Sequence, residues 1–354
     1  MSIASRINGR TIQVQGEEFL FCSGTAYLGI PYTSAFNQYF NEGIARYGTG
    51  YSASPGGNIR LEVYERAAHL LTQWTGATQC LTFSSGMMAG QCLIKTLAED
   101  SAFFYLKGAH PAMWHTANAP KSYDLETGLA QLQQDIDACT ERKITILAST
   151  VDALTPLIFD FSPLKKLKIS SEVSFVIDDS HGIGLLGSNG GGRYREIESM
   201  FPNWNVILTS SLGKAPGISA GMVGGKLALI ESLQKSPIYR GGSPALPATL
   251  HAFVHCWPDL FTYQLEVLNQ NTALLNGYSH ASKIFYTVDG FPVFRAKSPD
   301  LYEYLKRKGI WLSSFPYPDI DGDLVTRLVV NALLTDQDFD RIFSALEGWV
   351  RSGE

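Results

Sequence analysis

Two acidic residues and a histidine follow a short apolar segment near the middle of the chain. The segment Phe175–Ile177 is followed at once by Asp178, Asp179, Ser180 and His181. Open α/β sheets bind their ligands at the carboxyl ends of the strands. Because Asp178 and His181 are three residues apart, a turn could direct both side chains at one ligand. Charged groups at a strand end are costly unless they have a partner, so we expect a functional site here rather than a solvated turn.

A single lysine among small residues follows a second apolar segment. Lys214 stands in the run Ser211-Leu212-Gly213-Lys214-Ala215, directly after Val206–Ser210. Burial or a neighbouring cation lowers the pKa of a lysine and frees its amine for covalent chemistry with a carbonyl group. Most lysines, however, are exposed residues of the protein surface. Taken alone, the pattern leaves both interpretations of Lys214 open.

Two further strand ends carry weaker signals. Ser85, Gly86 and Met87 follow Cys80–Phe83 and begin a helical pattern, and a helix N-terminus attracts phosphate through its free N–H groups and its dipole. Serine is also an ordinary N-cap residue. His110 follows a third apolar segment, and a lone histidine in such a place is more often a structural hydrogen-bonding group.

Two other patterns suggest different chemistry but lack the context which that chemistry needs. Gly182, Gly184 and Gly187 form a GxGxxG sequence, yet the following Ser188–Gly192 cannot begin a helix, so we expect a loop and not a dinucleotide site. His251 and His255 are spaced as on a metal-binding helix. No glutamate accompanies them and no third ligand is evident, so we expect no metal.

Composition narrows the class of protein. The chain has 354 residues, of which 45% are hydrophobic, enough for a large core and too many for a disordered chain. The 28 basic and 33 acidic residues form no long run of one sign, so we expect no nucleic-acid or membrane surface. The sequence has no apolar run of membrane-spanning length, no signal-peptide pattern and no CxxC pair among its five cysteines. These features predict a cytoplasmic protein with reduced thiols.

Apolar strand-like segments and helical segments alternate through the middle of the chain. Such alternation predicts an α/β fold, in which helices cover a mostly parallel central sheet. The expected strands are Cys80–Phe83, Ala102–Leu106, Ile144–Thr150, Phe175–Ile177, Val206–Ser210 and Gly221–Gly224. The expected helices between them include Glu62–Trp74, Met87–Ala98, Leu125–Ala138 and Leu164–Ser171.

The pattern changes after Pro247 and predicts a smaller α+β domain. Its expected elements are a long helix Thr249–Leu274, a strand Ile284–Val288, a helix Asp300–Lys308, a strand Arg327–Ala332 and a final helix Asp336–Arg351. Because chain ends often meet, we expect residues 1–44 and 246–354 to form this small domain. Residues 45–245 would then form the large domain.

Several short motifs together resemble one enzyme family. They are Tyr27-Leu28-Gly29, Tyr47–Ser52, Phe83–Gly86, His110, Asp178–Gly184, Ser211–Ala215 and Arg327–Ala332. The pair Asp-x-Ser-His and Ser-Leu-Gly-Lys-Ala, in this order and spacing, is the most specific of these features. On these motifs the chain resembles the fold-type I pyridoxal 5'-phosphate (PLP) enzymes, and among them the α-oxoamine synthase family. The resemblance extends from about residue 20 to the C-terminus.

The resemblance implies a role for four residues at the reacting end of the cofactor. Lys214 would carry PLP covalently, and Asp178 would pair with the ring nitrogen and keep it protonated. His181 would donate a hydrogen bond to the phenolic oxygen, and His110 would stack on the ring face.

The resemblance also implies the anchoring groups. Ser85, Gly86, Met87 and Ser211 would bind the cofactor phosphate. Arg327 would bind the carboxylate of an amino acid through two parallel hydrogen bonds. No metal is implied.

The implied reaction is a decarboxylative condensation of a small amino acid (alanine, glycine or serine) with an acyl-CoA. An aminotransferase of the same fold and a PLP-fold scaffold without catalysis are the alternatives. A homodimer is implied, in which Arg240–Ser243 would reach the phosphate of the neighbouring subunit. The chain has Ala26, Leu61 and Leu334 where the family often has Asn, His and His, and we expect these differences to bear on the choice of substrate.

Overall fold

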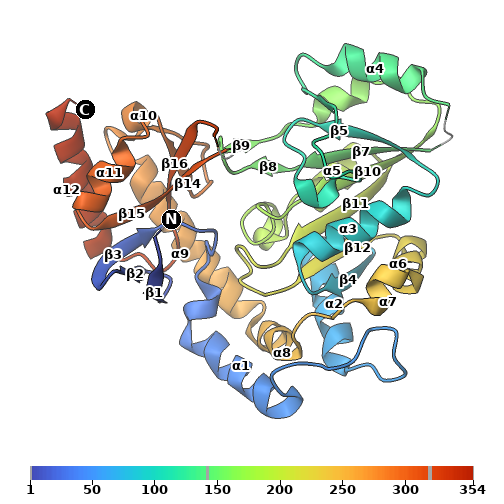
Figure 1. The fold of residues 1–354 in the computed structure, drawn as a ribbon, viewed down its shortest axis with the longest axis horizontal. Helices are drawn as coiled ribbons and strands as arrows, with labels where there is room; N and C mark the ends of the chain where they lie inside the picture. The colour runs from blue at the N-terminus through green and yellow to red at the C-terminus, as the bar shows by residue number, and fades with distance from the viewer. Residues whose placement is uncertain (1, 141–142, 318–320, 354) are drawn as a thin grey trace. The chain divides into compact units, whose positions relative to one another are not determined.

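The computed structural model describes residues 2–140, 143–317 and 321–353, which divide into two compact units. The larger unit contains Ser34–Val151 and Phe159–Trp257. The smaller unit contains the residues up to Thr33, the short segment Asp152–Ile158 and the residues from Pro258 onward, so both chain ends belong to it (Figure 1).

A seven-stranded sheet forms the centre of the larger unit, in the order β4-β12-β11-β10-β7-β5-β6. Strand β12 runs antiparallel to both of its neighbours, and the other pairs in the sheet are parallel. The mostly parallel α/β fold is therefore confirmed. The strands are β4 (Gln79–Phe83), β5 (Ala102–Leu106), β6 (Ser122–Tyr123), β7 (Lys143–Ser149), β10 (Glu172–Asp178), β11 (Asn205–Ser211) and β12 (Gly221–Gly225).

Helices pack against this sheet and bury its apolar side chains. Leu93 of helix α3 lies in one core cluster with Leu147, Val176 and Ile207 from three neighbouring strands. Burial of such side chains stabilises the fold by about 1.5–3 kcal/mol each and holds the strand ends in place. The helices of this unit are α1 (Ser34–Tyr47), α2 (Glu62–Thr75), α3 (Gly86–Leu97), α4 (Leu129–Asp137), α5 (Tyr194–Met200), α6 (Leu227–Lys235), α7 (Pro237–Gly241) and α8 (Pro247–Cys256). Three 3-10 turns accompany them, η2 (Pro111–Met113), η3 (Ser162–Lys166) and η4 (Ser188–Gly190).

Two predicted helices of this region differ from the structure. The expected helix Leu125–Ala138 begins only at Leu129, because the carboxylate of Asp124 accepts hydrogen bonds from the N–H groups of Glu126 and Thr127 and holds those residues in a turn. The expected helix Leu164–Ser171 is wrong, since only the single 3-10 turn η3 forms there.

The smaller unit has its own sheet, in the order β1-β2-β3-β15-β16-β14-β13. Its strands are β1 (Ala4–Ile7), β2 (Thr11–Val14), β3 (Glu17–Cys22), β13 (Phe285–Tyr286), β14 (Val293–Ala296), β15 (Ile310–Pro316) and β16 (Leu324–Val329). The turn η1 (Ile30–Tyr32) and the helices α9 (Asp259–Asn276), α10 (Ala281–Ile284), α11 (Leu301–Arg307) and α12 (Asp336–Ser352) complete it. The short strands β8 (Val151–Asp152) and β9 (Leu157–Ile158) pair with each other. This mixture of elements matches the expected α+β character.

The long predicted helix Thr249–Leu274 is wrong, because the chain forms the two helices α8 and α9. Proline has no N–H group and disfavours a helical conformation in the residue before it, so Pro258 separates the two helices. Helix α8 instead packs on α1 at close range, where a Cβ on Gly43 would lie 2.7 Å from the Cα of Ala248.

Helices α1 and α8 therefore belong to the larger unit. The predicted limits of 1–44, 45–245 and 246–354 instead place most of α1 and all of α8 in the small domain. As a statement about independently folding domains, those limits stay a prediction. In the described part of the chain, no helix is both long and apolar enough to cross a bilayer.

Candidate functional site

Asp178 and Lys214 follow neighbouring parallel strands of the larger sheet. Asp178 is the last residue of β10 and lies opposite Thr209 of β11. Strand β11 ends at Ser211, three residues before Lys214. The carboxyl ends of parallel strands share one edge of a sheet, so the strand register brings these two residues to the same edge.

Ser180 fixes the carboxylate of Asp178. Both the N–H and the hydroxyl of Ser180 donate to Oδ1 of Asp178, the N–H at 3.0 Å. The hydroxyl oxygen of Ser180 also accepts a hydrogen bond of 2.7 Å from the N–H of Ser211. A buried carboxylate with this support keeps one orientation, and it lies between the ends of β10 and β11.

Lys214 is half-buried at a tight turn after β11. The N–H of Gly217 donates to its carbonyl oxygen at 3.0 Å, and the N–H of Ile218 donates to the carbonyl of Leu212 at 2.8 Å. Burial lowers the pKa of the Lys214 amine, and the negative charge of Asp178 partly opposes that shift. A lysine with a lowered pKa is neutral, and therefore nucleophilic and basic, in a larger fraction of molecules near pH 7.

His110 lies near both charged groups. Its side chain is accessible to solvent, and its Nδ1 accepts a hydrogen bond of 3.1 Å from the N–H of Ala112 at the start of η2. The surrounding protein lowers the pKa of the imidazole by desolvation, Asp178 raises it and Lys214 lowers it further. The ring is consequently neutral at pH 7, which suits a flat apolar contact better than a charged one.

His181 lies in the turn that follows β10. The turn is closed by hydrogen bonds from the N–H groups of Gly182 and Ile183 to the carbonyl of Asp179, at 3.0 and 2.9 Å. The side chain of His181 is half-buried. Its place three residues after Asp178 agrees with the spacing that suggested a shared ligand.

The first turn of helix α3 lies against the end of β11. Ser85 is the N-cap residue, and its hydroxyl accepts a hydrogen bond of 3.1 Å from the N–H of Met88. A Cβ on Gly86 would lie 2.6 Å from the Cβ of Ser211, so only glycine permits this close approach. The N–H groups of a first helical turn have no partner within the helix. Together with the hydroxyls of Ser85 and Ser211, these N–H groups could bind an anion.

Arg327 lies on β16 of the smaller unit, between Ser313 of β15 and Arg295 of β14. Its side chain is buried, one terminal N–H donates to the carbonyl of Ala153 at 2.8 Å, and its Nε has no hydrogen-bond partner. Burial lowers the pKa of the guanidinium, while Tyr27 and Asp152 oppose the shift. No ion pair with Arg327 is found among the described residues. A buried guanidinium of this kind is ready to bind an anion.

The larger unit thus contains eight of the nine predicted site residues, while Arg327 belongs to the smaller unit. Sequence reasoning missed Ser180 as a functional residue. Its position two residues after an aspartate, typical of a side-chain-to-backbone turn, was the signal that could have identified it.

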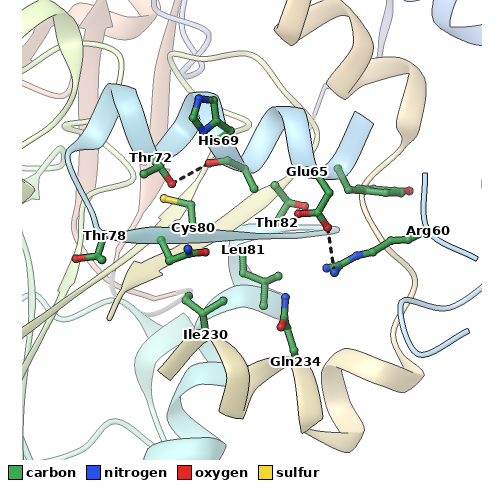
Figure 2. A pocket seen from close by; sticks show the side chains of 13 residues that line it. Arg60, Glu65, His69, Thr72, Thr78, Cys80, Leu81, Thr82, Ile230 and Gln234 are labelled. Carbon is green, nitrogen blue, oxygen red and sulfur yellow. Dashed lines mark hydrogen bonds and ion pairs between the residues drawn. The ribbon is translucent and has the colours of Figure 1, made fainter. Parts of the chain in front are cut away.

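A separate cavity of about 280 Å³ lies along the edge strand β4, between helices α2 and α6 (Figure 2). Arg60 and Glu65 form an ion pair of 3.0 Å at one end of it, and His69 lies farther along α2. Cys80 also lines this cavity. Desolvation raises the pKa of its thiol to about 11, so the thiol is protonated and unreactive at neutral pH. None of the predicted site residues lines this cavity.

Curated relatives cover almost the whole chain. An 8-amino-7-oxononanoate synthase of Aeromonas hydrophila is 24% identical over 359 residues, which covers 96% of this chain and 88% of the relative. The enzyme of the same name from Aeromonas salmonicida is 25% identical and covers 96% of this chain and 87% of the relative. No family model matches the chain.

Solved structures share the fold. A variant of serine palmitoyltransferase from S. paucimobilis, solved with a PLP–myriocin aldimine bound, superimposes with a TM-score of 0.84 at 15% identity and covers 99% of this chain and 92% of that one. The 8-amino-7-oxononanoate synthase of Francisella tularensis has a TM-score of 0.71 at 23% identity, over 93% of this chain and 96% of that one. The fold of PLP-dependent enzymes is thereby established for this chain.

Proposed function

We infer that this chain is an α-oxoamine synthase, a PLP-dependent acyltransferase that condenses an amino acid with an acyl-CoA and releases carbon dioxide. The similarity to 8-amino-7-oxononanoate synthases over nearly the whole length is the observation that carries this inference. The arrangement of Asp178, Lys214 and His110 at one edge of the sheet supports it independently.

The residues at this edge fit PLP. The half-buried amine of Lys214 is suited to a covalent link with the cofactor aldehyde, and the buried carboxylate of Asp178 is suited to the protonated ring nitrogen. When bound, PLP supplies an electron sink for the carbanion formed at the Cα of the amino acid. Asp178 would keep the ring nitrogen protonated, which would make that sink effective.

Lys214 moves the proton in this proposal. Its neutral amine would take the proton from the Cα of the amino acid and would return one at the end of the reaction. His181 would donate a hydrogen bond to the phenolic oxygen of the cofactor, and neutral His110 would cover the ring face. Ser85, Gly86, Met87 and Ser211 bind the phosphate with N–H and hydroxyl groups.

Arg327 binds the carboxylate of the amino acid, because its buried guanidinium has an Nε without a partner. We expect Arg327→Ala to lower kcat/KM at least about 30-fold, mainly through KM for the amino acid, since a buried charged pair is lost. Steady-state kinetics at varied amino acid and saturating acyl-CoA measure this effect. Arg295→Ala, on the neighbouring strand, is the control and should stay near wild type. An unchanged KM in Arg327→Ala would contradict the assignment.

Product analysis tests the proposed reaction. The purified protein, given PLP, alanine and a range of acyl-CoA esters, should release free CoA thiol and carbon dioxide in equal amounts. Formation of an oxo acid and pyridoxamine phosphate without thiol release would instead indicate an aminotransferase. No turnover with any donor, in a protein that holds PLP, would indicate a scaffold.

We propose that the amino acid is alanine, glycine or serine, and that alanine with a long-chain or pimeloyl-type acyl donor is the pair to test first. The curated relatives named 8-amino-7-oxononanoate synthase support this order. His110 above the ring would leave little room for a large substituent at Cα. Titration of the cofactor absorbance with a panel of amino acids tests the proposal, and tighter binding of bulky or acidic amino acids would contradict it.

We propose further that the protein is a cytoplasmic homodimer. Arg240, Gly241 and Ser243 are exposed in the single chain, as expected of a segment that reaches the phosphate of a second copy. Sedimentation of the PLP-saturated protein should give the mass of a dimer. An active, PLP-saturated monomer would contradict this prediction.

A further inference from the structure

We propose that Asp179 is a positioning residue, which fixes the loop between β10 and α5 and through it the places of Asp178, His181 and Lys214. The proposal rests on the proposed function and deepens it. Asp179 is buried and directly follows the residue that pairs with the cofactor, yet no step of the reaction uses its carboxylate.

Asp179 joins three parts of the chain that are distant in sequence. Its Oδ1 accepts a hydrogen bond from the hydroxyl of Thr150, which directly follows β7. Its Oδ2 accepts a hydrogen bond of 2.7 Å from the N–H of Arg193, directly before α5. Its own N–H donates to the carbonyl of Thr209 on β11 at 3.0 Å. One residue thus connects the carboxyl ends of three neighbouring strands to the end of the loop.

The loop closes around this carboxylate because two of its residues have no side chain. A Cβ on Gly182 would overlap Oδ1 of Asp179, and a Cβ on Gly192 would overlap Oδ2. The guanidinium of Arg193 fixes this end of the loop as well, because it donates a hydrogen bond of 2.6 Å to the carbonyl of Phe159. Gly182 of the dinucleotide-like sequence, together with Gly192, therefore forms part of a cage around the Asp179 carboxylate.

The same loop contacts the turn that carries Lys214. Gly184 has a φ of +89°, and a Cβ at this position would lie 2.7 Å from the Cβ of Ala215. A shift of the loop would therefore move the residue next to Lys214 on one side and the turn of His181 on the other. Misplacement of catalytic groups by about 1 Å can cost 10²-fold in rate.

The Asp179 carboxylate has hydrogen-bond partners that a neutral side chain would satisfy only in part. Burial raises its pKa to about 6, while hydrogen bonds from Thr150 and the N–H of Arg193, with the charge of Arg193, oppose the rise, and Asp178 adds to it. A neutral amide at this position would keep one acceptor and lose the charge. The N–H of Arg193 or the hydroxyl of Thr150 would then face a weaker partner or none.

Two variants test the proposal against a matched control. Asp179→Asn alters the carboxylate, and Thr150→Val removes its hydroxyl partner while keeping the charge. Leu233 lies on the buried face of α6, so Leu233→Ala lowers stability without touching the loop. For each protein the melting temperature, PLP content, kcat, KM and the pH midpoint of the visible cofactor absorbance are measured.

We expect both loop variants to keep PLP, to lose at least about tenfold in kcat with little change in KM, and to shift the pH midpoint. Leu233→Ala should change only the melting temperature. If the loop variants behave like Leu233→Ala, the proposal is overturned. If Asp179→Asn does not fold, Thr150→Val decides the question by the same readouts. Absence of a cofactor absorbance in the wild type would refute the proposed function instead, so the two failures are distinguishable.

Discussion

Lys214→Ala should lower kcat/KM by at least about 10⁴-fold, because one residue supplies both the covalent anchor and the base in the proposed reaction. Desolvation lowers the pKa of this amine, and it lies close enough to Asp178 for the carboxylate to oppose that shift. Alanine has neither function and leaves the turn closed, since the turn is held by backbone hydrogen bonds such as the one from Gly217. Steady-state thiol release with alanine and the best acyl-CoA measures the loss.

The control for this variant is Lys226→Ala, an exposed lysine that directly precedes α6 in the same unit. It should keep wild-type activity. Retention of more than a tenth of the wild-type rate in Lys214→Ala would show that another group performs the proton transfer.

Asp178→Asn should give the second largest loss, about 10²–10³-fold in kcat, with PLP still bound. The asparagine side chain keeps an oxygen for Ser180, so the local structure survives. It loses the charge that would, in the proposed reaction, keep the ring nitrogen of PLP protonated, and loss of one such electrostatic contact costs about this much. Kinetics in parallel with PLP content separate this effect from loss of the cofactor.

An exposed aspartate of the same unit provides the comparison. Asp160 accepts hydrogen bonds from Ser162 on the surface, and Asp160→Asn should leave kcat unchanged. If Asp178→Asn and Asp160→Asn were equally active, the carboxylate of Asp178 would have no role in the reaction.

The central sheet could be predicted from the sequence because its strands are buried on both faces. Phe175–Ile177 is continuously apolar, Val206–Ser210 begins with three apolar residues, and both segments are strands in the structure. The chemistry-bearing residues follow the strands directly, so the edge of the sheet that carries them was predictable as well.

Other elements lacked such a signal. The residues of β1 are all exposed and show no alternation, and this strand is defined by its pairing with β2 rather than by its composition. The break between α8 and α9 had a local signal at Pro258, which the long helical pattern on either side obscured.

In the site, too, some features are visible in short sequence motifs, whereas others depend on contacts that only the fold creates. The short motifs around Asp178 and His181 and around Lys214 are each local in the sequence, and they carry the resemblance to a family. The cage around Asp179 requires Thr150 and Arg193, which lie 29 and 14 residues away, and only the fold brings them together. The unpartnered Nε of Arg327 depends likewise on the packing of β16 and has no signature in the sequence.

The point at which PLP attaches to the chain tests the proposed function most directly. The purified protein is saturated with PLP, reduced with borohydride, digested and analysed by mass spectrometry. We expect a pyridoxyl group on Lys214, and none in Lys214→Ala treated in the same way. A protein that acquires no such group, or acquires it at another lysine while Lys214 stays unmodified, would contradict the proposed function.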